Sequence, residues 1–354
     1  MKNEFLAGCQ DISIYLGDIC NFDCTYCDRD YIKDTIGGQK MSSEDVPYIL
    51  DFMLAMSDDE MPVDMISFHG GEPFVYIKLM DEILDRIVKE FGDTEFMIFI
   101  QTNGSLILGN EWFLDKWKDQ LMISISYDFL YQDINRSLFD IHGTIEALSE
   151  RDIAVQLQYV MPINDRKVFS LKAIKSITDI CHGHNDISVN LIPLRHIRGK
   201  DKFRVILDDI DVKQTAASFL QFIQMLYVMK VNVTVDGHGS EIDKHYFDNH
   251  KQLVLSPDGF IYPEYDFLEY KMEATRVGNW RRIEIDRQRD EEHLLLDGCK
   301  TCPSREMCGL KYLYKAFDKE PEGSCVEFYA LLKIAIQHAQ KLKQKNTLLH
   351  WIGI

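Results

Sequence analysis

Short apolar runs alternate with stretches of helical spacing through the first two thirds of the chain, and each run is typical of a buried strand. The expected strands are Ile12–Leu16, Val63–Phe68, Phe96–Gln101, Met122–Ser126, Ala154–Val160 and Ile187–Ile192. The expected helices between them are Ser43–Met56, Lys78–Phe91, Glu111–Trp117, Gly143–Ser149 and Val168–Cys181. Repeated strand–helix alternation implies an α/β fold with a parallel sheet. Six such units fit either an open barrel or an open doubly wound sheet, and the pattern does not separate the two.

The pattern changes after residue 199, where a charged and weakly periodic stretch predicts a boundary. A long amphipathic helix follows over Val212–Lys230, and short β-like runs come next at Leu253–Leu255 and Gly259–Tyr262. A last helix is expected over Val326–Lys345. The chain is therefore divided into a core of residues 1–205, a linker helix region of residues 206–240 and a smaller domain of residues 241–354.

Composition and charge narrow the class of protein. Hydrophobic residues make up 46% of the chain and charged residues 27%, which is ordinary for a globular protein. The net charge of −18 counts against a surface that follows the phosphates of a large nucleic acid. No signal peptide is visible and no apolar run reaches the roughly 20 residues of a membrane helix, so we expect a cytoplasmic protein without a membrane partner. Its nine cysteines then favour metal binding or catalysis over disulfides.

Three cysteines stand close together directly after the first expected strand. Residues 20–27 are CNFDCTYC, so Cys20, Cys24 and Cys27 follow the spacing Cys-x3-Cys-x2-Cys. Three thiolates at this spacing can hold three irons of a 4Fe–4S cluster and leave the fourth iron open to another ligand. The alternative is a zinc site, for which His69 is a possible fourth ligand, or plain buried cysteines.

This motif resembles the signature of the radical S-adenosylmethionine (SAM) superfamily, in which an aromatic residue precedes the third cysteine, as Tyr26 does here. The resemblance implies a partial (β/α)6 TIM-type barrel. It also implies a 4Fe–4S cluster that binds SAM and cleaves it reductively to a 5′-deoxyadenosyl radical, which abstracts a hydrogen atom from the substrate.

Further segments resemble SAM-binding motifs of the same superfamily. Residues 70–73, GGEP, resemble the motif that binds the SAM amino group, and a carboxylate such as Glu72 suits an ammonium ion. Residues 101–104, QTNG, and Ser126 of the S-x-D segment resemble further contacts, and a following arginine matches the one that assists there. The SAM-binding residues implied by the resemblance are Tyr26, Gly70, Gly71, Glu72, Pro73, Thr102, Asn103, Ser126 and Arg136.

A second group of cysteines near the end of the chain resembles the SPASM and twitch extensions of these enzymes, which carry auxiliary clusters. The segment Ser256–Pro263 resembles the hairpin of that extension, and Val277–Trp280 the stretch after it. Glu264 and Tyr312 stand where the family has cysteines, so one ligand set is lost and one remains. The resemblance implies a single auxiliary 4Fe–4S cluster, with a zinc ion as the alternative, on Cys299, Cys302, Cys308 and Cys325.

The resemblance implies a radical SAM enzyme of the SPASM/twitch type whose substrate is a peptide or protein side chain, as in maturases. Candidate acid–base groups are Asp128, Glu264 and Asp266. The electron donor is expected to be a flavodoxin or ferredoxin. One alternative is radical oxidation or rearrangement of a small molecule such as an aminocyclitol or a nucleotide. Another is a non-catalytic iron–sulfur or zinc protein.

Overall fold

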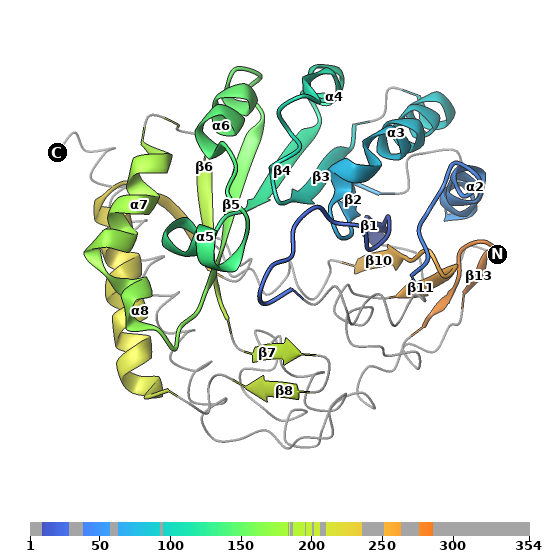
Figure 1. The fold of residues 1–354 in the computed structure, drawn as a ribbon. Coiled ribbons are helices and arrows are strands. Elements are labelled where there is room, and N and C mark those ends of the chain that lie inside the picture. The colour runs from blue at the N-terminus through green and yellow to red at the C-terminus, as the bar shows by residue number, and fades with distance from the viewer. Residues whose placement is uncertain are drawn as a thin grey trace, which may run out of the picture.

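The computed structural model describes residues 9–27, 38–56, 63–92, 95–182, 184, 187–194, 196–199, 202–205, 210–235, 251–262 and 276–285. Within them the chain forms a curved sheet with helices along its outer side (Figure 1). The predicted helix Val326–Lys345, Glu264, Asp266 and the four cysteines from Cys299 to Cys325 lie outside the described residues. The predicted division into three segments stays a prediction.

Eleven strands of the described chain form one sheet, and their spatial order is β13-β12-β11-β10-β1-β2-β3-β4-β5-β6-β9. All neighbours from β10 to β9 run parallel, whereas β10 to β13 pair antiparallel. A separate antiparallel pair joins β7 (His196–Gly199) to β8 (Lys202–Val205). The strands of the large sheet are β1 (Cys9–Tyr15), β2 (Met65–His69), β3 (Met97–Thr102), β4 (Leu121–Ser126), β5 (Ala154–Met161), β6 (Ile187–Pro193), β9 (Asn232–Val235), β10 (Lys251–Leu255), β11 (Phe260–Tyr262), β12 (Gly278–Asn279) and β13 (Glu284–Ile285).

The six predicted strands are confirmed, and the fold is the predicted α/β type with a parallel sheet. The strands β1 to β6, each followed by a helix, are the six predicted strand–helix units, and β9 and β10 extend the parallel part of the sheet to eight strands. Periodicity missed β9 because only Asn232–Val235 alternates, which is too short a run to stand out. Strand β10 pairs with β1, although more than 230 residues separate them; Leu253, for example, lies opposite Ile12.

The predicted helices that fall within the described residues are present, and two of them begin at other residues than expected because of side-chain caps. Asp140 accepts a hydrogen bond from the backbone N–H of Gly143, so α6 begins earlier than expected. Ser170 caps α7 in the same way after a short 3-10 turn, which delays that helix. The helices are α2 (Val46–Met56), α3 (Ile77–Phe91), α4 (Glu111–Trp117), α5 (Gln132–Asn135), α6 (Ile141–Ser149), α7 (Leu171–Cys181) and α8 (Val212–Val228), with 3-10 turns η1 (Pro73–Tyr76), η2 (Phe129–Tyr131) and η3 (Arg166–Phe169).

The two faces of the sheet differ in chemistry. Residues on the outer face, such as Ile12 and Ile14 of β1, are fully buried and apolar and pack under the helices. Alternate residues point the other way, and hydrogen bonds between them show that they share the inner face. This face is rich in polar residues, although Tyr15, Phe99 and Ile192 also lie on it, whereas branched apolar side chains usually fill eight-stranded barrels. Its polar residues are Asp11, Ser13, Ser67, Gln101, Ser124, Ser126, Gln156, Gln158, Ser188, Asn190, Thr234 and Gln252.

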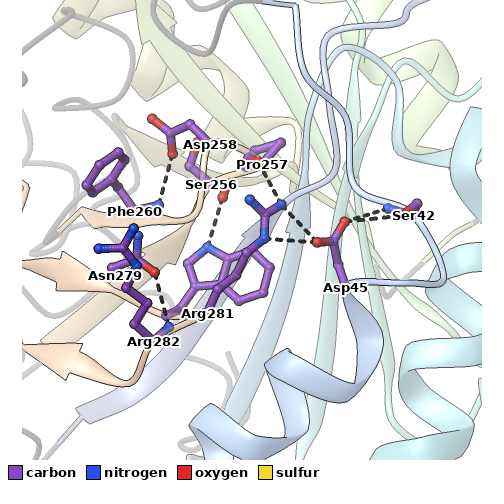
Figure 2. Close-up of polar contacts among 10 residues, drawn as sticks. Ser42, Asp45, Ser256, Pro257, Asp258, Phe260, Asn279, Arg281 and Arg282 are labelled. Atoms are coloured by element: carbon purple, nitrogen blue, oxygen red, sulfur yellow. Dashed lines mark hydrogen bonds and ion pairs between the residues drawn. The ribbon is translucent and has the colours of Figure 1, made fainter.

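The turn between β10 and β11 is fastened to the start of α2 (Figure 2). The buried indole of Trp280 donates a hydrogen bond to the carbonyl of Ser256 at 2.9 Å. Arg281 donates to the carbonyl of Pro257 and pairs with Asp45, both at 2.8 Å. The other carboxylate oxygen of Asp45 accepts the backbone N–H of Ser42. These contacts join the segment after residue 250 to the segment that follows the cysteine loop.

No helix of the described chain combines the length and the apolar character needed to cross a bilayer.

Candidate functional site

The three predicted cysteines lie in the loop after β1, at the carboxyl end of the parallel strands. Cys20 and Cys24 are half-buried and Cys27 is exposed. Two N–H groups point at the sulfur of Cys20, from the backbone of Phe22 at 3.4 Å and from the side chain of Asn103 at 3.8 Å. Hydrogen bonds of this kind to sulfur are a usual feature around the ligands of iron–sulfur clusters. The loop is therefore suited to present sulfur ligands rather than to bury inert cysteines.

The two glycines of the GGEP segment are required by the close approach of the cysteine loop. The backbone N–H of Gly71 donates to the carbonyl of Gly17 at 2.8 Å, and that of Glu72 donates to the carbonyl of Ile19 at 2.9 Å. A Cβ atom on Gly71 would lie only 2.5 Å from the Ile19 carbonyl oxygen, and one on Gly70 would lie 2.6 Å from that of Gly17. The end of β2 thus supports the loop that carries the cysteines.

Glu72 is fully buried, and its carboxylate holds the neighbouring strand ends together. One oxygen accepts from the hydroxyl of Thr102 at 2.6 Å and from the backbone N–H of Phe74 at 3.0 Å; the other accepts from the N–H of Asn103 at 2.7 Å. Burial raises the pKa of this carboxyl, and these hydrogen bonds oppose the rise. The contacts give Glu72 an internal structural role. The predicted contact with the SAM ammonium stays a prediction.

A chain of side-chain hydrogen bonds connects the end of β3 to the cysteine loop. Asn103 donates to the side-chain oxygen of Asn21 at 2.8 Å, and Asn21 donates to the hydroxyl of Ser105 at 2.9 Å. Ser105 in turn donates to the side-chain oxygen of Asn103 at 2.6 Å. Sequence reasoning named Asn103 but missed Asn21 and Ser105, because short polar residues in loops carry no distinctive spacing.

Tyr26, Asp128 and Arg136 form a second connection to the loop, from the end of β4. The phenol of Tyr26 donates to Asp128 at 2.6 Å and accepts from Nε of Arg136 at 2.7 Å. Arg136 Nε also lies 3.4 Å from Asp128, and its guanidinium lies 5.3 Å from the centre of the Tyr26 ring. Burial raises the pKa of the Asp128 carboxyl, and Arg136 and Tyr26 counteract this. These contacts favour a structural role for Asp128, and its acid–base role stays a prediction.

The remaining predicted residues of the described chain lie at the same edge of the sheet. Pro73 begins η1 directly after Glu72, and Thr102 is the last residue of β3. Ser126 is the last residue of β4 and is 8% exposed. His69 ends β2, and burial lowers the pKa of its imidazole to about 4, so the side chain is neutral at pH 7. The structure thus brings the predicted SAM-binding positions to one end of the strands.

The donor set fits an iron–sulfur cluster better than a single metal ion. Among the residues that the structure describes, no three His, Cys, Asp or Glu side chains converge closely enough to share one ion. A zinc site made of the three cysteines with or without His69 therefore finds no support. In a 4Fe–4S cluster each thiolate binds a different iron, so its ligands need not converge on one point. The N–H donors at Cys20 and the cationic Arg136 beside Cys24 suit such an anionic group.

Comparison with known proteins identifies the domain. Residues 14–168 match the family model of the Radical SAM superfamily. An uncharacterized protein of Methanocaldococcus jannaschii is 27% identical over 124 residues, which are 35% of this chain and 40% of that relative. The match thus spans about two fifths of the length of that relative.

Two solved structures share the fold over most of the chain. The structure of anSMEcpe with bound AdoMet and the Cp18Cys peptide is 16% identical, covers 94% of this chain and 99% of that chain, and has a TM-score of 0.61. Streptococcus suis SuiB bound to its precursor peptide SuiA is 15% identical, covers 90% of this chain and 76% of that chain, and has a TM-score of 0.59. The family match and the shared fold lead us to conclude that residues 14–168 form a radical SAM domain.

Proposed function

We propose that this chain modifies a peptide or protein side chain by abstracting a hydrogen atom from it. The observation that carries the proposal is the cysteine loop, whose three thiols lie at the end of the strands above a polar inner face. The cluster and SAM, when bound to Cys20, Cys24 and Cys27, would supply the 5′-deoxyadenosyl radical. Further support comes from anSMEcpe and SuiB, which share the fold and are bound to peptides in their structures.

Different residues around the cysteine loop would hold the cluster and SAM. The backbone N–H groups of Gly71 and Glu72 hold the loop in place, and the carboxylate of Glu72 holds Thr102 and Asn103. Thr102, Asn103 and Ser126 present polar groups at the strand ends, where SAM would lie. Arg136 uses Nε for Tyr26, which leaves its terminal nitrogens for the SAM carboxylate.

The chain would carry a second, auxiliary 4Fe–4S cluster on Cys299, Cys302, Cys308 and Cys325, as the sequence resemblance implies. Four thiolates would leave no open iron there, so this cluster would serve electron transfer or stability rather than substrate binding. Reduction would come from a flavodoxin or ferredoxin in the cytoplasm.

Anaerobic reconstitution followed by iron counting and a 5′-deoxyadenosine assay tests the chemistry. We expect about eight irons per chain, and about four in a Cys299→Ala/Cys302→Ala variant, because each cluster holds four irons. Cys24→Ala should abolish 5′-deoxyadenosine formation. Cys181→Ala is the matched control, since Cys181 is a half-buried cysteine at the end of α7, away from the loop. Zinc in place of iron, or SAM cleavage by the Cys24→Ala variant, would refute the proposal.

The substrate class requires a separate experiment. The reconstituted enzyme, SAM and dithionite would be incubated with small peptides encoded beside the gene, and the products analysed by mass spectrometry. A SAM-dependent mass change in a peptide supports the peptide assignment. SAM cleavage that responds only to a small metabolite would replace it with the small-molecule alternative.

A further inference from the structure

One pair of side chains on the polar inner face reaches across a strand. Gln101 of β3 donates a hydrogen bond from its side-chain nitrogen to the side-chain oxygen of Gln158 of β5 at 3.0 Å. Strand β4 lies between these two strands in the sheet, and its Ser124 is the register partner of Gln101. The two carboxamides therefore lie over the inner face of β4.

This pair leaves hydrogen-bonding capacity unused. A carboxamide has one oxygen and two N–H donors. The single bond between the pair leaves the oxygen of Gln101 and the nitrogen of Gln158 without a hydrogen bond to any described part of the chain. The hydroxyl of Ser124 is fully buried and also has no hydrogen-bond partner within the described chain. Buried polar groups are rarely left unsatisfied, so the buried hydroxyl of Ser124 indicates a missing partner beside the half-buried glutamine pair.

The pair lies close to the cysteine loop. Gln101 precedes Asn103 by two residues, which is about 7 Å along a strand, and the side chain of Asn103 donates to Cys20. Both glutamines are half-buried, so a ligand can reach them.

The side chains directly beside the pair favour an uncharged ligand. The inner-face residues beside the pair are Ser124, Ser126 and Asn190, none of which is charged. Asp11 is the charged inner-face residue of β1, but it lies at the opposite end of the strands and is bonded to Ser67 and Gln252. Asp128 and Arg136, at the end of β4, are bonded to Tyr26. An ion beside the glutamine pair would lose its hydration without gaining an opposite charge.

We propose that Gln101 and Gln158 form a binding subsite for one uncharged amide group of the substrate, either a peptide bond or the side chain of an asparagine or glutamine. The ligand N–H would donate to the free oxygen of Gln101, and the ligand carbonyl would accept from the free nitrogen of Gln158. This inference deepens the proposed function, on which it rests, because it names the group of a peptide substrate that the inner face recognises.

The test measures binding of a small probe, N-acetylglycine N-methylamide, to the reconstituted enzyme with SAM by ligand-observed NMR. Methyl acetoxyacetate is the matched probe, with both amides replaced by esters, and N-acetylglycine adds a negative charge. We expect the Kd of the diamide to be lower than that of each of the other two probes by a factor of at least about ten. A factor of ten corresponds to about 1.4 kcal/mol, which is typical of one hydrogen bond.

The variants Gln158→Glu and Gln158→Met should each weaken amide binding about tenfold or more, because each removes the donor. Gln156→Glu is the matched control. Gln156 lies on the same strand and the same face as Gln158, two residues earlier in β5 and outside the subsite. The Gln156→Glu variant should bind the amide as tightly as the natural chain does. The proposal is overturned if Gln158→Met binds like Gln156→Glu, if the ester binds as tightly as the amide, or if the natural chain binds no amide.

A separate 5′-deoxyadenosine assay on the natural chain distinguishes the two proposals. If SAM is not cleaved but amide binding depends on Gln158, the proposed function fails and the subsite stands. If SAM is cleaved and amide binding does not depend on Gln158, only the subsite fails.

Discussion

The hydroxyl of Tyr26 donates a 2.6 Å hydrogen bond to the carboxylate of Asp128, which follows it by 102 residues in the chain. Tyr26 lies between the second and third cysteines of the loop, and Asp128 lies just after β4. Arg136 completes the contact by donating from Nε to the same phenol oxygen at 2.7 Å. The cysteine loop is thus held to the fourth strand through the side chain next to Cys27.

Replacing Tyr26 with phenylalanine should loosen the loop without removing the ring. The change deletes two hydrogen bonds, one to the carboxylate of Asp128 and one from Nε of Arg136, and a single bond to a charged group contributes about 1.5–3 kcal/mol. We expect a lower melting temperature, measured by circular dichroism on anaerobically reconstituted protein, and faster loss of iron to a chelator. Tyr48→Phe is the control, since Tyr48 is 47% exposed on α2. Equal melting temperatures and iron loss in the two variants would show that the link does not hold the loop.

The variant Glu72→Gln separates the structural role of Glu72 from SAM binding. The carboxylate accepts three hydrogen bonds, and the amide nitrogen of glutamine would face one of the same donors. We expect a loss of about 1–3 kcal/mol in the free energy of unfolding without SAM, because a buried donor is left unsatisfied. Urea unfolding of the SAM-free protein measures it.

The control for this variant is Glu90→Gln, because Glu90 is exposed on α3. If Glu72→Gln weakened SAM binding but left the stability of the SAM-free protein equal to that of the control, the carboxylate would instead be a ligand of the SAM ammonium.

Much of this fold could be predicted because its signals are local. The strands β1 to β6 are short apolar runs between helical stretches, and the cysteine spacing marks the loop. A β-like run was expected at Leu253–Leu255, but the parallel pairing of β10 with β1 could not be predicted, because it depends on contacts between distant parts of the chain. The first residues of α6 and α7 also differ from the predicted ones, because the capping side chains of Asp140 and Ser170 form hydrogen bonds that periodicity does not reveal.

The site was predictable as a set of positions but not as a network. The motifs gave Glu72, Thr102 and Asn103 separately, whereas their mutual hydrogen bonds required coordinates. The glutamine pair had a usable signal that was not recognised. Gln156 and Gln158 alternate with apolar residues in β5, and this alternation marks a strand with one polar face.

The contact between Asp45 and Arg281 should contribute measurably to joining the later strands to the core. Its N–O distance is 2.8 Å, and the two side chains are 11% and 33% exposed, so water screens the pair only in part. A double-mutant cycle with Asp45→Asn and Arg281→Met should give a coupling energy of about 1 kcal/mol. The exposed pair Lys175–Asp179 is the control, with an expected coupling of about 0.3 kcal/mol. A coupling no larger than that of the control pair would contradict this fastening role.

The carboxyl of Asp11 should make the stability of the protein depend on pH. Burial raises the pKa of Asp11 to about 6 in the folded chain, from an ordinary value of 3.8, and hydrogen bonds from Ser67 and Gln252 only partly oppose the rise. The folded protein therefore holds this proton more tightly than the unfolded chain does. Stability should fall as the pH rises from about 4 to about 6, by up to about 3 kcal/mol in total, and stay reduced above that range.

The variant Asp11→Asn should remove this dependence, because its side chain is neutral at every pH. Its oxygen can still accept from Ser67, and the amide of Gln252 can turn to accept from its nitrogen while the hydroxyl of Ser13 turns to donate. In urea unfolding between pH 4.5 and 7.5, the free energy of unfolding of the variant should rise relative to that of the natural chain as the pH rises. The exposed Asp51→Asn is the control. Stability curves that stay parallel for Asp11→Asn and the natural chain would mean that Asp11 is not titrating in this range.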